Sequence, residues 1–228
     1  MRAPIGGSPL SRCSSLVLMI IAVGWAGGIH LGTAVAEEPR AEIGPGARPG
    51  EATAQRGQRV PAIEDGVIAS FEDGAISATF GAGWAMNTDA DAGGKSEAVM
   101  EPVAGGADGS GSSMRVSGKI VPWGGPGAWA GPIFFPGRRP YGAVDMSKYE
   151  GISFWVRGDG SPVSVVMFAR SLREDPATAL VSTTEEWTEH RLPFAAFDGV
   201  DSKGLTAIMF SGAEPGDFAF QIDELRVW

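Results

Sequence analysis

The sequence predicts an all-β domain of the sandwich or barrel type, and three observations carry this prediction. From residue 63 onward, short segments alternate apolar and polar residues, which is the pattern of a half-buried strand. Turn residues separate these segments, and the 228-residue chain contains 34 glycines and 16 prolines. Within residues 63–228, no segment places apolar residues at helical spacing over ten or more positions.

The strand pattern recurs along the chain at short intervals. It is clearest where Ile152, Phe154 and Val156 alternate with Ser153, Trp155 and Arg157. The expected strands are Val67–Glu72, Glu97–Val103, Ser113–Val121, Ala128–Phe135, Gly151–Arg157, Pro162–Ala169, Trp187–Leu192, Leu205–Ser211 and Phe218–Trp228. Residues 63–228 therefore form one domain of about 165 residues, a usual size for a sandwich or barrel.

The first 36 residues have the three parts of a secretory signal. Arg2 and Arg12 give a positive start, Leu16–Gly28 is almost wholly apolar, and Ala34–Ala36 offers small residues for cleavage. The apolar run is shorter than the ~20 residues of a spanning helix. We expect cleavage, export to the periplasm or the extracellular space, and no membrane span in the mature chain, although an uncleaved anchor is the alternative.

Residues 37–62 predict a disordered linker between the signal and the domain. Eight of these 26 residues are glycine or proline, and only Ile43 and Val60 are large aliphatics. Such a segment buries too little apolar surface to offset the entropy lost on ordering.

The composition excludes several classes of function. The full chain has a net charge of −9, and removal of the signal leaves 16 basic and 27 acidic residues, a net charge of −11. That charge argues against nucleic acid as a partner. The expected mature chain has no cysteine and one histidine, His190, so thiol catalysis and Cys/His zinc sites are excluded. His190 has no serine partner suggested by the local sequence, and we expect it on the surface.

Several short sequence motifs occur in a recognisable order along the chain. The most specific is Val144–Gly160, which reads VDMSKYEGISFWVRGDG. The others are Ser70–Gly74, Trp84, Asp89–Ser96, Trp129–Gly131, Trp187, Leu192–Phe197 and Ile222–Leu225. Together they resemble the complex I intermediate-associated protein 30 family and the related family 11 carbohydrate-binding modules, over Val67–Trp228. The resemblance implies a galactose-binding-like jelly roll, a two-sheet antiparallel β-sandwich.

The acidic residues suggest a structural calcium ion. Calcium prefers carboxylate and carbonyl oxygens, and modules of the resembled type often hold it where the first and last strands meet. The resemblance implies Glu72 and Asp223 as ligands, with carbonyl groups from the Gly94–Lys95 loop, and Asp73 adjoins Glu72. The alternative is that these acids cap strands and face water.

Aromatic and arginine side chains are the candidate ligand contacts. Trp123 and Tyr141 lie in expected loops, and Trp155 is out of phase with the core residues of its strand. An exposed ring stacks on the apolar face of a sugar. Arg157 and Arg170 are expected to line a groove with Trp155 if that side of the sheet is concave. Arg138 and Arg139 are suited to a carboxylate or an acidic sugar. The alternative is that these tryptophans fill the core or cover loops.

Three functions remain open on the sequence alone. The first is a non-catalytic module that binds carbohydrate, and the second is a protein-interaction or assembly factor with an envelope protein as partner. The third is a carbohydrate-active hydrolase or lyase, for which Glu185, Glu186, Glu189, Asp145 and Asp159 are the candidate carboxylates. We expect no enzyme, because the groups that a reaction class requires are missing.

Overall fold

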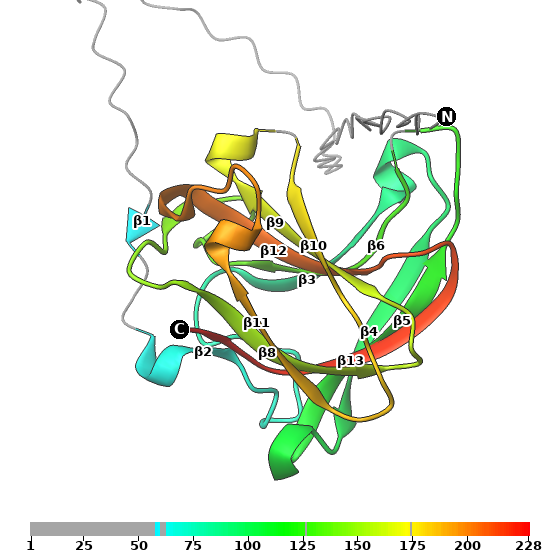
Figure 1. Ribbon diagram of the computed structural model, residues 1–228, viewed down its shortest axis with the longest axis horizontal. Helices are drawn as coiled ribbons and strands as arrows, with labels where there is room; N and C mark the ends of the chain where they lie inside the picture. Colours follow the sequence, from blue (N-terminus) through cyan, green and yellow to red (C-terminus); the bar gives the residue numbers. More distant parts are fainter. Residues whose placement is uncertain (1–57, 60–62, 126, 174) are drawn as a thin grey trace, which may run out of the picture.

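A computed structural model describes residues 58–59, 63–125, 127–173 and 175–228. The expected signal and all of the linker except Gln58–Arg59 lie outside the described residues. Two β-sheets, called sheet A and sheet B below, pack face to face (Figure 1). The two-sheet antiparallel sandwich expected from the sequence is confirmed, apart from one short parallel pair between β1 and β7.

Sheet A contains seven strands, and β12 is its central strand. The order across the sheet is β10-β9-β12-β6-β3, and the short β7 and β1 continue from one end of β12. The strands are β1 (Gln58–Arg59), β3 (Gly83–Thr88), β6 (Ala130–Phe135), β7 (Val144–Asp145), β9 (Val163–Ala169), β10 (Ala177–Val181) and β12 (Leu205–Gly212).

Sheet B contains six strands, and the C-terminal strand β13 runs through its centre. The order is β11-β8-β13-β5-β4, and β2 pairs with the last residues of β13. The strands are β2 (Val67–Ala69), β4 (Glu97–Ala104), β5 (Ser112–Ile120), β8 (Gly151–Gly158), β11 (Thr188–Pro193) and β13 (Gly216–Val227).

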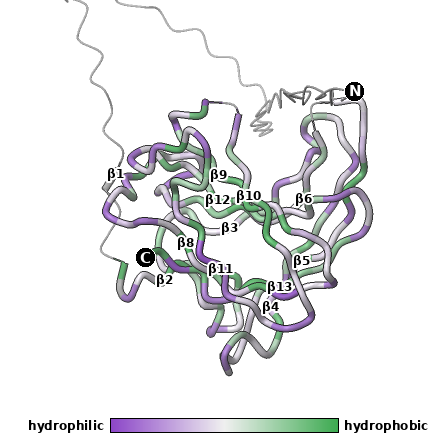
Figure 2. The backbone as a smooth tube through the Cα atoms, viewed as in Figure 1, coloured by the Kyte–Doolittle hydropathy of each residue, from purple (hydrophilic) through white to green (hydrophobic). Residues whose placement is uncertain are grey.

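The core fills the space between the two sheets because alternate residues of each strand point inward. Phe154 from sheet B meets Phe210 from sheet A with 5.0 Å between ring centroids. Trp84 of β3 packs against Phe134 at 5.5 Å and also contacts Phe71. Figure 2 shows hydrophobic stretches along β12 and β13 and hydrophilic ones in many connecting loops.

A bulge resets the alternation near the end of β13. Asp223 pairs with Trp155 of β8 and Arg226 pairs with Ser153, so β13 carries one residue more than its partner. The extra residue, Glu224, has a φ of 49°. The bulge turns Leu225 into the core, and Asp223 stays on the outer side of sheet B.

The strand pattern identified most of the fold. All nine expected strands are present with shifted ends, whereas β1, β3, β7 and β10 were not expected, and β1 lies within the segment expected to be a disordered linker. The helices of the described residues are all short 3₁₀ turns: η1 (Glu64–Gly66), η2 (Asp89–Ala92), η3 (Ala107–Gly109), η4 (Arg170–Leu172), η5 (Phe194–Ala196) and η6 (Ser202–Gly204). Among the described residues, no helix is long and apolar enough to cross a membrane.

Candidate functional site

Sheet A has apolar side chains on its outer side as well as on its core side. Met209 of β12 lies beside Ile133 of β6 and Val166 of β9, and Thr178 of β10 continues this row to the sheet edge. The outward cluster, called the apolar face below, consists of Ile133, Phe135, Phe168, Ala207 and Met209, with Ala85, Trp129, Tyr141 and Val166 partly exposed around it.

A pocket of about 200 Å³ opens on the apolar face. Its lining contains no charged residue and consists of Gly127, Ala128, Trp129, Ser164, Val166, Phe168, Pro176, Thr178, Met209, Ser211, Gly212 and Ala213. The hydroxyls of Ser164 and Thr178 make no hydrogen bond to another described residue. An apolar floor with a ring and free hydroxyl groups suits a ligand that has both C–H and O–H surface.

The ring of Trp129 is fixed at the pocket wall. Its Nε1–H donates to the side-chain oxygen of Asn87 at 2.7 Å, and its backbone N–H donates to buried Asp89 at 3.3 Å. Asp89 also accepts hydrogen bonds from the backbone N–H and the hydroxyl of Ser96, at 2.8 and 2.6 Å. A β-carbon on Gly94 would lie 2.2 Å from the Asp89 carboxyl group, so a larger residue at this position would displace that carboxyl group. The Asp89 loop therefore holds Trp129 in place before any ligand arrives.

Tyr141 covers the other end of the apolar face. Its ring lies 4.9 Å from Phe135 and 6.3 Å from Phe168, and burial raises its pKa. The C-terminal ends of β6 and β9 both meet the N-terminal end of β12, so the turn that follows β6 and the helix η4 that follows β9 lie at the same end of sheet A. The structure thereby brings Tyr141, Arg138, Arg139 and Arg170 to one end of the apolar face, although no contact with a ligand is tested.

Trp123 contacts its own loop. Its Nε1–H donates to the carbonyl oxygen of Gly127, and its ring lies against Gly93 and Gly125. Gly127 begins the segment that lines the pocket. In this arrangement Trp123 supports the pocket wall, and its expected contact with a ligand stays a prediction.

Trp155 and Arg157 lie on the outer side of sheet B, where charged residues predominate. A hollow of about 480 Å³ is lined by Trp155, Glu189 and Arg226 among others, and one of about 370 Å³ by Arg157 and its neighbours. Arg157 donates to Gln221 at 3.1 Å and lies over the ring of Trp187. The expectation that Trp155, Arg157 and Arg170 line one groove is wrong, because Arg170 follows β9, which belongs to the other sheet. Both hollows are open, and their charged groups lose hydration when a ligand covers them.

Among the carboxylates proposed for catalysis, Asp159 is not suited to act as a general acid. Asp159 and Glu185 line the same hollow of sheet B. Burial acts to raise the pKa of Asp159, but several hydrogen bonds, of which those from Ser161 are the largest, together hold the pKa below its ordinary value. A glycosidase needs one carboxyl group with a raised pKa as its general acid. Ionised Asp159 does not supply that function.

The expectation that His190 lies on the polar outer side of its strand is also wrong. His190 of β11 pairs with Phe154 of β8, and its ring stacks on the core side against the Phe154 ring, with 5.9 Å between centroids. The alternation places Glu189 and Arg191 outward and His190 inward. His190 is partly exposed, but its Nε2 is buried and has no hydrogen-bond partner among the described residues.

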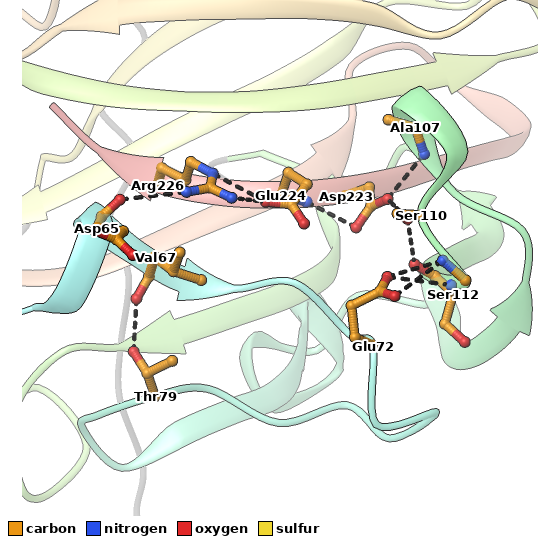
Figure 3. A network of polar contacts seen from close by, with 11 residues as sticks. Asp65, Val67, Glu72, Thr79, Ala107, Ser110, Ser112, Asp223, Glu224 and Arg226 are labelled. Carbon is orange, nitrogen blue, oxygen red and sulfur yellow. Dashed lines mark hydrogen bonds and ion pairs between the residues drawn. The ribbon is translucent and has the colours of Figure 1, made fainter.

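Three carboxylates meet where β13, β2 and the loop between β4 and β5 come together (Figure 3). Glu72, Asp223 and Glu224 each bring an oxygen within 4.8 Å of the others. Asp223 is fully buried, and it accepts hydrogen bonds from the Ala107 N–H at 2.9 Å and the Ser110 hydroxyl at 2.5 Å. Burial is the largest influence on Asp223 and raises its pKa.

The other two acids of this cluster are more exposed. Glu72 accepts from the Gly111 N–H at 3.0 Å, which is the main reason that its pKa lies below the ordinary value. Glu224 forms an ion pair with Arg226. Glu224 adjoins Asp223 but was not among the expected ligands, because only the bulge turns this residue toward the other two acids.

Two parts of the expected calcium site are wrong. Asp73 accepts hydrogen bonds from the Ala75 N–H and the Ser77 hydroxyl, at 3.0 and 2.9 Å, and is not part of the cluster. The Gly94–Lys95 loop precedes β4, whereas the cluster lies beyond the other end of β4, about 23 Å away along the strand. The loop that meets Glu72 and Asp223 is the one between β4 and β5.

The chemistry of the cluster is compatible with calcium. Three carboxylates supply hard oxygen ligands of the kind that calcium prefers. Each carboxylate oxygen has two lone pairs, so it can accept an N–H and still coordinate a cation. Glu72, Asp223 and Glu224 are therefore the residues that would hold such an ion.

Two solved structures of a carbohydrate-binding module share this architecture. One is the family 11 module of the cellulosomal cellulase Lic26A-Cel5E from Clostridium thermocellum, which is 18% identical, with a TM-score of 0.51 over 63% of this chain and 86% of that one. The other is the family 11 module from Clostridium thermocellum in complex with a β-1,3-1,4-mixed-linked tetrasaccharide, also 18% identical, with a TM-score of 0.50 over 63% and 87%.

No protein-family model and no curated protein matches this sequence. The resemblance to the complex I intermediate-associated protein 30 family therefore has no support beyond the residues that suggested it. At 18% identity the structural likeness shows the fold and nothing further. The chain has the two-sheet β-sandwich fold seen in family 11 carbohydrate-binding modules.

Proposed function

We propose that this protein is an exported, non-catalytic carbohydrate-binding module that binds its ligand on the apolar face. The observation that carries the proposal is the uncharged pocket beside Trp129, whose ring is fixed by Asn87. A fixed ring loses little conformational entropy when a sugar stacks on it. Ser164 and Thr178 also line the pocket, and their hydroxyls, which make no hydrogen bond to another described residue, are available to bond the sugar edge.

The likeness to the two Clostridium thermocellum modules supports this proposal, since both are binding modules and one is described with a bound tetrasaccharide. The lowered pKa of Asp159, which disfavours this residue as the general acid of a glycosidase, is consistent with a non-catalytic role. Export rests on the signal expected in residues 1–36.

A glycan array probed with the purified protein tests this function. We expect binding to one class of polysaccharide fragment, without release of shorter products on prolonged incubation. An array without binding, together with capture of an envelope protein, would replace this proposal with the assembly-factor alternative. Release of shorter products would favour a hydrolase or lyase.

We also propose that the cluster of Glu72, Asp223 and Glu224 binds a structural Ca²⁺. Addition of CaCl₂ to chelator-treated protein is expected to release or absorb heat in calorimetry. At 100 times the dissociation constant it should raise the unfolding free energy by about 2.7 kcal/mol. For a domain of this size, that corresponds to a rise in Tm of about 5–10 °C.

The matched variants Glu72→Gln and Asp73→Asn assign this calcium response to the cluster. Glu72→Gln is expected to reduce the rise in Tm, because it removes a ligand charge. Asp73→Asn should leave the rise unchanged, since Asp73 bonds only to its own turn. The absence of both heat and a Tm change in the unmodified protein would exclude calcium.

A further inference from the structure

Arg138 and Arg139 are exposed on an acidic protein without a partner for either guanidinium. Neither forms an ion pair, a side-chain hydrogen bond or a cation–π contact with another described residue. Other arginines do form such contacts: Arg115 pairs with Glu101, Arg226 with Glu224, and Arg191 lies over the ring of Trp228. The two free guanidinium groups are therefore available to an external anion.

The turn that carries the two arginines is tightly built. The N–H of Gly142 donates to the carbonyl oxygen of Arg139 at 3.0 Å. A β-carbon on Gly137 would lie 2.3 Å from the carbonyl oxygen of Gly142, so the two ends of the turn approach closely. Tyr141 has a φ of 56°, in the left-handed region. Packing against Phe135 holds its ring in place, and the backbone that carries the arginines is fixed with it.

The apolar face has two ends. The pocket rim at Gly212 and Ala213 lies at one end, and the arginine turn lies at the other. Phe168 belongs both to the contact with Tyr141 and to the lining of the pocket, so the two regions adjoin. Along β12 the face is about 23 Å long, which is enough for several sugar rings. A glycan that follows the face from the pocket therefore reaches the arginine turn.

We propose that the ligand is an acidic glycan whose uronate carboxylate groups bind Arg138 and Arg139. This inference rests on the proposed carbohydrate-binding function and names the class of its ligand. A guanidinium group donates two parallel hydrogen bonds to a carboxylate, and such charge-assisted bonds are stronger than neutral ones. The net charge of −11 expected for the exported chain repels a polyanion elsewhere on the surface, so the two arginines orient the chain along the face.

Matched pairs of hexasaccharides test this ligand class, because the members of each pair differ only at C6. Calorimetry compares cellohexaose with its C6-oxidised uronate form, and β-1,4-mannohexaose with β-1,4-hexamannuronate. The same comparison is made for the glycan backbone that binds best on the glycan array. For at least one glycan backbone, the uronate hexasaccharide is expected to bind about tenfold more tightly than its neutral counterpart. An increase in NaCl from 50 to 500 mM should reduce this difference, because salt screens exposed charges.

The double variant Arg138→Gln/Arg139→Gln should lose the preference and retain binding to the neutral member. Arg115→Gln on sheet B is the control that removes the same kind of charge, and it should keep the preference. Equal or weaker binding of every uronate member would overturn the inference, as would a preference that survives in the double variant. In both cases, binding of a neutral glycan would leave the proposed function intact. Absence of binding to any glycan would overturn both.

Discussion

Val166→Arg should weaken glycan binding about 100-fold or abolish it, with little change in stability. Val166 is half-buried and lies at the centre of the apolar face, between Met209 and Thr178. An arginine side chain would fill much of the 200 Å³ pocket and displace the ligand, while its charged end reaches water along the sheet surface. A 100-fold loss corresponds to about 2.7 kcal/mol of binding free energy. Calorimetry with the tightest-binding glycan measures this loss.

Val99→Arg is the matched control for this substitution. Val99 is 61% exposed and lies on the outer side of sheet B. The same change of side chain there should leave the dissociation constant within about twofold, since surface substitutions away from a site have small effects. Undiminished binding by Val166→Arg would show that the ligand does not occupy the apolar face.

Asp223→Ala should lower the free energy of unfolding by about 3 kcal/mol when measured in chelator. The substitution leaves the buried N–H of Ala107 and the hydroxyl of Ser110 without their acceptor, and an unpaired buried polar group costs about 1–3 kcal/mol. It also releases the loop between β4 and β5 from the centre of sheet B. For a domain of this size we expect a fall in Tm of about 6–12 °C by scanning calorimetry.

The control for this change lies on the same strand. Asp217 is exposed and pairs with Lys119 at 3.6 Å, an ion pair of the kind that contributes up to about 1 kcal/mol. Asp217→Ala should therefore change stability much less than Asp223→Ala. A loss below 1 kcal/mol for Asp223→Ala would contradict the role given to the buried network.

The parts of the fold predicted from the sequence are those in which one face of a strand is apolar and the other polar. In β8 the inward Ile152, Phe154 and Val156 alternate with outward polar residues, and this pattern identified both the strand and its faces. Strand β10 was missed because its inward residues include Ala177 and Ala179, which give little hydrophobic contrast. Strand β3 was missed because its residues are half-buried on both sides.

The candidate site was harder to predict than the fold. Tyr141 and its neighbouring arginines were correctly placed in a loop, but the pocket residues Val166 and Met209 were not singled out. Their strands are apolar on both faces, and in the sequence such a continuous apolar run indicates a strand buried on both sides in the core. A second apolar face on β9 and β12 is the signal that could have revealed them. The acidic cluster depends on the bulge at Glu224, which no local pattern predicts.

The tryptophan indole signals in a ¹H–¹⁵N NMR spectrum test the central claim most directly. Trp129 lines the pocket of the apolar face, and Trp155 lies on the outer side of the opposite sheet. On titration with the tightest-binding glycan, the Nε1–H signal of Trp129 is expected to shift and that of Trp155 to stay in place. A shift of Trp155 with no change at Trp129 would contradict the account and place the ligand on sheet B.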